Sequence, residues 1–140
     1  MGDGWDEVHD LAVKYPHMPL HAVSGNSDFG SGPDVLAFNF GSKKFVITHG
    51  HRYDVKYDRL RICLLAEENE ADVCMFGHTH LPELFYHGRS LMLNPGSISL
   101  PKGNYLGCYG VVDISESGVI EGRVMAREIG RECKEYRRIL

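Results

Sequence analysis

Residues 72–80 read Asp-Val-Cys-Met-Phe-Gly-His-Thr-His, a short apolar run followed by a glycine and two histidines. The run predicts a buried strand that ends at Gly77, so His78 and His80 fall in the loop after it. Open α/β sheets present ligand-binding side chains from such strand ends. Two imidazoles two residues apart can face adjacent metal ions or share one, although such a pair taken alone is typical of a surface loop.

The same arrangement occurs upstream, where residues 45–51 read Phe-Val-Ile-Thr-His-Gly-His. This run predicts a second strand with His49 at its exit, and Gly50 allows the backbone to turn sharply there. The second imidazole, His51, has three open interpretations. It can bind substrate, orient another ligand, or only line the loop.

Oxygen donors precede both histidine pairs. Residues 25–28 read Gly-Asn-Ser-Asp, and Asn26 offers a neutral carbonyl oxygen, although an isolated Gly-Asn pair is usually a turn. Asp3 follows Gly2, and its carboxylate can bridge two cations about 3.5–4 Å apart, although alone it would be interpreted as a helix cap. Together with the histidines these donors predict a divalent metal site. Its candidate ligands are Asp3, Asn26, His49, His78 and His80.

A further motif, Asn-Pro-Gly-Ser at residues 94–97, follows an apolar run. It is either a tight turn or a place where backbone amides and the Ser97 hydroxyl meet a phosphate oxygen. The other histidines have no partner motif and are interpreted as ordinary surface or core residues. These are His9, His17, His21 and His87.

Hydrophobic periodicity and turn residues predict two helices, over residues 6–15, capped by Asp3 or Asp6, and 57–69. They predict strands over 20–24, 35–40, 44–48, 72–76, 84–86, 91–93, 107–114 and 119–126, with a hairpin turn at Gly41-Ser42. Helix and strand alternate first and strands dominate later. The order favours an α/β fold in which a mixed sheet packs on a second sheet with helices outside.

The 140 residues fit a single domain over 1–140, and the hydrophobic fraction of 43% supports a core. A net charge of −4 gives no overall attraction to nucleic acid or to an anionic membrane, so a phosphate must be held locally, as a metal would hold it. No apolar run approaches the roughly 18 residues of a membrane span. We expect a soluble, cytoplasmic protein.

The four cysteines are scattered and lack C-x-x-C spacing, which favours buried reduced thiols over a disulfide or a metal site. They are Cys63, Cys74, Cys108 and Cys133. The last segment mixes basic residues with glutamates and is interpreted as a solvated helix face or frayed tail, with a nucleic-acid-binding arm as the weaker alternative. Its basic residues include Arg131, Lys134, Arg137 and Arg138.

The order Gly-Asp, Gly-Asn-x-Asp, His-Gly-His, Gly-His-Thr-His and Asn-Pro-Gly-Ser, from residue 2 to 97, resembles the calcineurin-like metallophosphoesterase superfamily. More narrowly, it is similar to the small bacterial and archaeal phosphodiesterases related to the metallophosphoesterase-like subunit of retromer. The resemblance implies an α/β/β/α sandwich of two mixed sheets flanked by helices, with metal ions at the strand ends.

The resemblance also implies ligand sets. Asp3 would bridge two ions, and Asn26, His49 and His78 would complete one site. The other ion would take Asp3, His80, and an Asp and a His from an amino-terminal Asp-x-His motif that is absent before Asp3 in this sequence. We therefore expect a domain truncated at its amino terminus and lacking the family's first strands. Such a chain should fold with difficulty, borrow a strand, or dimerise through an exposed edge.

Ser27 stands where many larger family members carry a histidine, which supports the narrower resemblance.

The leading hypothesis is a metal-dependent phosphodiesterase that hydrolyses small phosphodiesters by metal-activated hydroxide attack on phosphorus, with His51 and Asn26 as catalytic residues. One or two divalent ions are expected, manganese first, with iron, nickel, cobalt or zinc as alternatives. Homo-oligomers are a further expectation; nucleic acid and membranes are not expected partners. The alternative hypothesis is a catalytically inactive scaffold that binds partner proteins.

Overall fold

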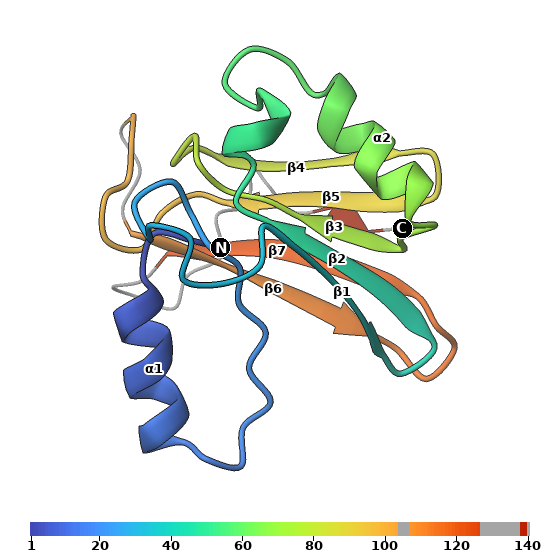
Figure 1. Ribbon diagram of the computed structural model, residues 1–140. Helices are drawn as coiled ribbons and strands as arrows, with labels where there is room; N and C mark the ends of the chain where they lie inside the picture. Colours follow the sequence, from blue (N-terminus) through green and yellow to red (C-terminus); the bar gives the residue numbers. More distant parts are fainter. Residues whose placement is uncertain (104–106, 127–137, 140) are drawn as a thin grey trace.

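A computed structural model describes residues 1–103, 107–126 and 138–139 (Figure 1). Its elements are α1 (Trp5–Lys14), β1 (Val35–Phe40), β2 (Lys43–Thr48), the 3-10 turn η1 (His51–Tyr53), α2 (Leu60–Glu68), β3 (Val73–Met75), β4 (Pro82–His87), β5 (Ser90–Pro95), β6 (Cys108–Ile114), β7 (Ile120–Ala126) and β8 (Arg138–Ile139). Most of the predicted elements are confirmed. Helix α2 begins three residues later than predicted, because a turn precedes it in which the Tyr57 amide donates to the Asp54 carbonyl.

The first sheet has the order β1-β2-β3-β5-β4. Its three central strands are parallel and its two edge strands are antiparallel, so the sheet is mixed, as predicted. The hairpin at Gly41-Ser42 is confirmed by the pairing of Phe40 with Lys43. Because β2, β3 and β5 are parallel, their carboxyl ends lie at the same edge, and the loops that carry the histidine motifs and the Asn-Pro-Gly-Ser motif all leave from it.

The second sheet has the order β6-β7-β8 and packs on the first. We expected it to be mixed, but the three described strands pair only antiparallel, since β6 and β7 form a hairpin. Apolar side chains fill the space between the sheets, and they are Phe45, Val73, Leu84, Leu91, Leu93, Cys108, Ile120 and Val124. Gly122 on β7 permits close packing here, because a Cβ on it would lie 2.8 Å from Leu91.

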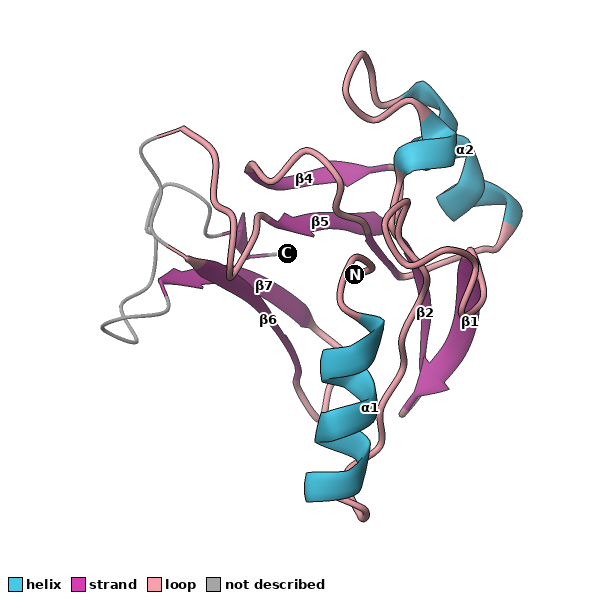
Figure 2. Cartoon of the chain, turned by 60° about the vertical axis from the view of Figure 1, so that its left-hand side comes forward, coloured by secondary structure: helices cyan, strands magenta, loops and turns pink. Residues whose placement is uncertain are grey.

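Helix α2 covers the other face of the first sheet. Four of its residues, Ile62, Cys63, Leu65 and Ala66, join a core with Val46, Cys74 and Met92. Helix α1 buries none of its residues and extends away from both sheets (Figure 2). The described layers are therefore helix, sheet and sheet, and α1 does not form a fourth layer over the second sheet.

Two predicted elements differ from the structure. Residues 20–24 form no strand, although Val23 and Ser24 are buried. In the described residues no strand pairs with this segment, and its Ser24 amide bonds instead to the Pro33 carbonyl. Arg138 begins strand β8 rather than lying on a helix, whereas the other three basic residues named for this segment lie outside the described residues.

Cysteines 63, 74 and 108 are buried, as the sequence predicted, and Cys133 lies outside the described residues. Burial raises the pKa of the Cys74 thiol to about 12. Within the described part of the chain, no helix is long and apolar enough to cross a bilayer.

Candidate metal centre

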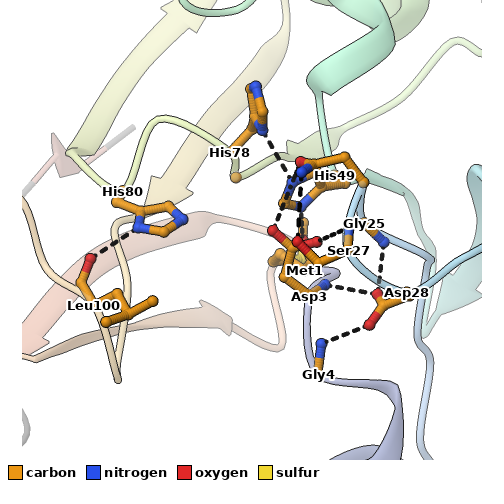
Figure 3. Close-up of polar contacts among 12 residues, drawn as sticks. Met1, Asp3, Gly4, Gly25, Ser27, Asp28, His49, His78, His80 and Leu100 are labelled. Atoms are coloured by element: carbon orange, nitrogen blue, oxygen red, sulfur yellow. Dashed lines mark hydrogen bonds and ion pairs between the residues drawn. The ribbon is translucent and has the colours of Figure 1, made fainter.

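His49 is the centre of a compact polar cluster at the carboxyl edge of the first sheet (Figure 3). It directly follows β2, and it is 2% exposed. Its Nε2 lies 3.0 Å from Oδ1 of Asn26, 3.1 Å from Nδ1 of His78 and 3.3 Å from Oδ2 of Asp3. Three other candidate ligands, from three separate segments, thus meet one nitrogen.

The opposite nitrogen of His49 fixes the tautomer of the ring. Nδ1 lies 2.6 Å from the carbonyl oxygen of Met1, and a carbonyl only accepts, so Nδ1 carries the hydrogen. Nε2 then presents its lone pair to the cluster, the arrangement that metal-binding histidines adopt. Burial lowers the pKa of His49 and outweighs the opposing effects of the Met1 carbonyl and Asp3, so the ring is neutral at pH 7.

His78 leaves the neighbouring strand, β3, and is also neutral. Burial, followed by the charge of Lys56, lowers its pKa to about 4. Its backbone φ is 68°, in the left-handed region that residues other than glycine rarely adopt. This conformation directs the side chain toward His49 (Figure 3).

The distances fit a metal-binding role. In an octahedral site with metal–ligand bonds of about 2.1 Å, adjacent donor atoms lie about 3.0 Å apart. The three distances from Nε2 of His49 span 3.0 to 3.3 Å. Among the described residues, no group of three or more His, Cys, Asp or Glu side chains could hold an ion by itself. The donor set therefore depends on the amide oxygen of Asn26.

His80 lies apart from this cluster. Its Nδ1 donates to the carbonyl of Leu100 at 2.8 Å, and Figure 3 shows its ring to one side of Asp3 and His49. The structure thus brings together four of the five predicted ligands and leaves His80 separate. The hydrogen bond to Leu100 leaves Nε2 of His80 with a free lone pair.

His51, in η1, lines the same cluster. Its ring centroid lies 5.3 Å from that of His49 and 6.1 Å from that of His78. Its Nδ1 is buried and has no hydrogen-bond partner among the described residues. This position beside the cluster allows each of the three interpretations of His51.

Residues 1–117 match the family described as the calcineurin-like phosphoesterase superfamily domain. The chain belongs to this superfamily. It is 37% identical over 107 residues to the probable metallophosphoesterase YsnB of Bacillus subtilis strain 168, covering 75% of this chain and 63% of the relative. It is 36% identical over 108 residues to phosphodiesterase YfcE of Escherichia coli strain K12, covering 71% and 55%. The chain thus spans less than two thirds of the length of either relative.

Solved structures show the same fold. A predicted phosphoesterase from Streptococcus pneumoniae TIGR4 superposes with a TM-score of 0.78 at 29% identity, covering 99% of this chain and 91% of that one. Vps29 from Entamoeba histolytica, described as complexed with Zn²⁺, has a TM-score of 0.73 at 21% identity, covering 94% and 73%. The likeness to Vps29 shows the fold alone.

Asp28 is a residue of this cluster that sequence reasoning missed. Its carboxylate accepts the amide hydrogens of Asp3 and Gly25, each at 2.7 Å, and of Gly4 and Trp5 at 2.9 and 3.1 Å. Burial raises the pKa of Asp28, but the four amides together outweigh it and the net pKa is lowered. One carboxylate thus joins the segments that carry Asp3 and Asn26. The available signal was the aspartate of the Gly-Asn-x-Asp motif.

Asp28 also accepts hydrogen bonds from the amides of Gly4 and Trp5 at the start of α1, as a helix-capping side chain does. We predicted that Asp3 or Asp6 caps α1, but the N-cap residue is Gly4 and no side-chain bond of the usual local kind is present. The prediction was wrong because the carboxylate comes from far along the chain. Asp3 instead accepts the Ser27 amide at 2.8 Å, which ties it to the Asn26 loop.

The Asn-Pro-Gly-Ser motif lies where the chain leaves β5, with Asn94 and Pro95 in the strand and Gly96 and Ser97 after it. The Gly96 amide donates to Oδ1 of Asn94 at 3.0 Å, and the Ser97 hydroxyl accepts the Leu100 amide at 3.0 Å. These hydrogen bonds fix the backbone at the end of the strand.

Proposed function

We propose that this phosphoesterase domain hydrolyses small phosphodiesters with a divalent metal ion held by Asp3, Asn26, His49 and His78. The observation that carries the proposal is the convergence of three donor groups on Nε2 of His49, with spacings that suit a shared ion. The family supplies the reaction class, since the relatives are named as metallophosphoesterases or phosphodiesterases.

A divalent ion bound here would activate water and offset charge on the phosphate. The chain's own residues fix the donors in place. The Met1 carbonyl holds His49 in the tautomer with Nε2 free, and Asp28 holds the backbone of Asp3. Mixed nitrogen and oxygen donors suit manganese, and iron, nickel, cobalt and zinc remain alternatives.

Asn26 and His51 are the proposed contacts to the phosphate. Asn26 is exposed, and its Nδ2 donates to the Ser27 hydroxyl at 3.4 Å, a long bond that a phosphate oxygen can replace. The His51 ring lies beside those of His49 and His78, with centroid distances of 5.3 and 6.1 Å. Hydrogen bonds from these two side chains would stabilise negative charge that develops on the phosphate oxygens.

Two features favour small diesters as substrates. The net charge of −4 gives no general attraction to a polyanion such as nucleic acid. In addition, Ser27 offers no imidazole that could protonate a strongly basic leaving group. Diesters with weakly basic leaving groups should therefore react faster than simple monoesters.

The test is hydrolysis of bis-p-nitrophenyl phosphate by the full chain during a manganese titration. We expect metal-dependent turnover that falls at least about 100-fold in His78→Ala, since a ligand to the ion is lost. His17→Ala is the matched control, because His17 lies exposed in a turn away from the cluster, and its turnover should equal that of the unaltered chain. Turnover that is absent, or equal in His78→Ala, would exclude the proposed activity and leave the scaffold hypothesis.

A further inference from the structure

His78 occupies a strained turn. The Thr79 amide donates to the Gly77 carbonyl at 2.9 Å, which closes a three-residue γ-turn around His78. The φ of 68° at its centre makes this the rare, strained form of the γ-turn. A residue in such a conformation persists only where the surrounding structure holds it.

Asn94 supplies that restraint from the adjacent strand. It lies near the end of β5, which pairs with β3, and it is fully buried. Its Nδ2 donates to the Gly77 carbonyl at 3.2 Å and to Oγ1 of Thr79 at 2.9 Å. The two hydrogens of one amide therefore hold the residues immediately before and after His78.

The hydrogen-bonding capacity of Asn94 is well satisfied. Its Oδ1 accepts the Gly96 amide, so both the donor group and the acceptor of the side chain are engaged. A buried amide with all its groups paired favours one arrangement of its neighbours over others, because any movement leaves a polar group unpaired without water. The Gly77 amide is also fixed, since it donates to the His49 carbonyl at 2.9 Å.

We propose that Asn94 is a positioning residue for the metal centre. It holds the γ-turn so that Nδ1 of His78 stays 3.1 Å from Nε2 of His49, and it touches neither the ion nor the substrate. This inference rests on the proposed function, because it assigns Asn94 a role through the ligand His78. It gives the buried asparagine of the Asn-Pro-Gly-Ser motif a role at the neighbouring His78 loop.

The experiment compares Mn²⁺ affinity, measured from the electron paramagnetic resonance signal of free Mn²⁺ in the presence of the full chain. Asn94→Asp removes both donors with little change of shape, and we expect affinity to fall at least about 100-fold. Thr79→Val removes the 2.9 Å bond from Asn94, together with the long 3.3 Å bonds between its hydroxyl and Leu81, and keeps the bond from Asn94 to Gly77. We expect affinity to fall about 10-fold. If Asn94→Asp does not fold, Thr79→Val alone tests whether Asn94 positions His78.

Ser90→Ala is the matched control. Its hydroxyl is buried and donates to the Ala71 carbonyl at 2.6 Å, at the opposite end of β5 from Asn94. It should lower the melting temperature of the metal-free chain as Thr79→Val does, but leave Mn²⁺ affinity unchanged. Amide resonances of residues 77–80 in the metal-free chain should shift in Thr79→Val and stay in place in Ser90→Ala.

The outcomes separate the two proposals. If the unaltered chain does not bind Mn²⁺, the proposed function fails. If it binds Mn²⁺ and Thr79→Val binds equally well, the proposed function stands and the positioning role of Asn94 is overturned. Reduced affinity in Thr79→Val with unchanged affinity in Ser90→Ala supports both.

Discussion

Half of the described residues other than glycine that have a positive φ are predicted metal ligands. Six residues other than glycine have a positive φ in the described part of the chain, and they are Asp3, Phe29, Asp54, Glu70, His78 and His80. Three of these six, Asp3, His78 and His80, are predicted metal ligands. Each such conformation costs of order 1–3 kcal/mol, so the fold must offset that cost through bonds to the same loops. Asp28 provides such a bond to the Asp3 amide, and Asn94 provides two to the residues that flank His78.

Replacement of Asp28 by asparagine tests whether its hydrogen bonds stabilise the strained loops. An ionised carboxylate only accepts hydrogen bonds. In asparagine, one of the two oxygens is replaced by an NH₂ group, which would face two of the four backbone N–H groups and could accept from neither. We expect the free energy of unfolding of the metal-free chain to fall by about 2 kcal/mol. Urea unfolding measures it.

Asp10→Asn is the control for that measurement. Asp10 lies exposed on α1, so its replacement should change the free energy of unfolding by no more than about 0.5 kcal/mol. Equal stability of Asp28→Asn and the unaltered chain would show that the four backbone bonds contribute nothing to the fold.

At the scale of elements, the sequence predicted the parts that depend on local pattern. An apolar run followed by glycine and histidine correctly located β2, β3 and the loops that carry His49 and His78. The strand at 20–24 was wrong because a strand also needs a paired neighbour, which no local pattern reports. His80 bonds to the Leu100 carbonyl, which no residue pattern announces. The Gly-Asn-x-Asp motif pointed to Asp28, but its four partners are backbone amides, which residue types do not identify.

Asp72 joins three elements of the first sheet, and its pKa predicts how acid affects the stability of the fold. It lies just before β3, accepts the Lys44 amide of β2 at 2.9 Å, and pairs with Arg89 in the β4–β5 turn at 2.8 Å. Burial raises its pKa, but these partners outweigh burial and hold the pKa below its usual 3.8. A lowered pKa in the folded state means that stability is present above pH 3.8 and is lost as the pH falls below it.

Asp72→Asn should therefore lower the free energy of unfolding by about 1–3 kcal/mol at pH 7, and the difference from the unaltered chain should shrink below pH 3.8. Urea unfolding at pH 7 and pH 3 measures both values. Asp113→Asn is the control, because its ion pair with Arg123 is on the surface and should matter by less than about 1 kcal/mol. If the free energies of unfolding of Asp72→Asn and the unaltered chain differ by the same amount at both pH values, ionised Asp72 does not stabilise the fold.

For the whole molecule, the position of the proposed metal centre depends on the strands that carry its candidate ligands. The central strands β2, β3 and β5 lie between α2 on one face and the second sheet on the other. Because both faces are packed, the carboxyl ends of these strands hold fixed positions relative to each other. His49, His78 and Asn94 all follow or end these strands. The core therefore brings these segments side by side, and their local hydrogen bonds set the spacing of the side chains.

Leu91→Ala tests whether core stability and metal binding can be separated. Leu91 is fully buried between the sheets against Gly122, near the start of β5 and away from Asn94. Its truncation should lower the free energy of unfolding by about 2–5 kcal/mol, while the folded chain keeps its Mn²⁺ affinity, since the strand ends are unchanged. Leu60→Ala, at a position 64% exposed on α2, should cost less than about 0.5 kcal/mol. A large loss of Mn²⁺ affinity in folded Leu91→Ala would mean that the centre is positioned by the intersheet core directly, and not by the local bonds of Asp28 and Asn94.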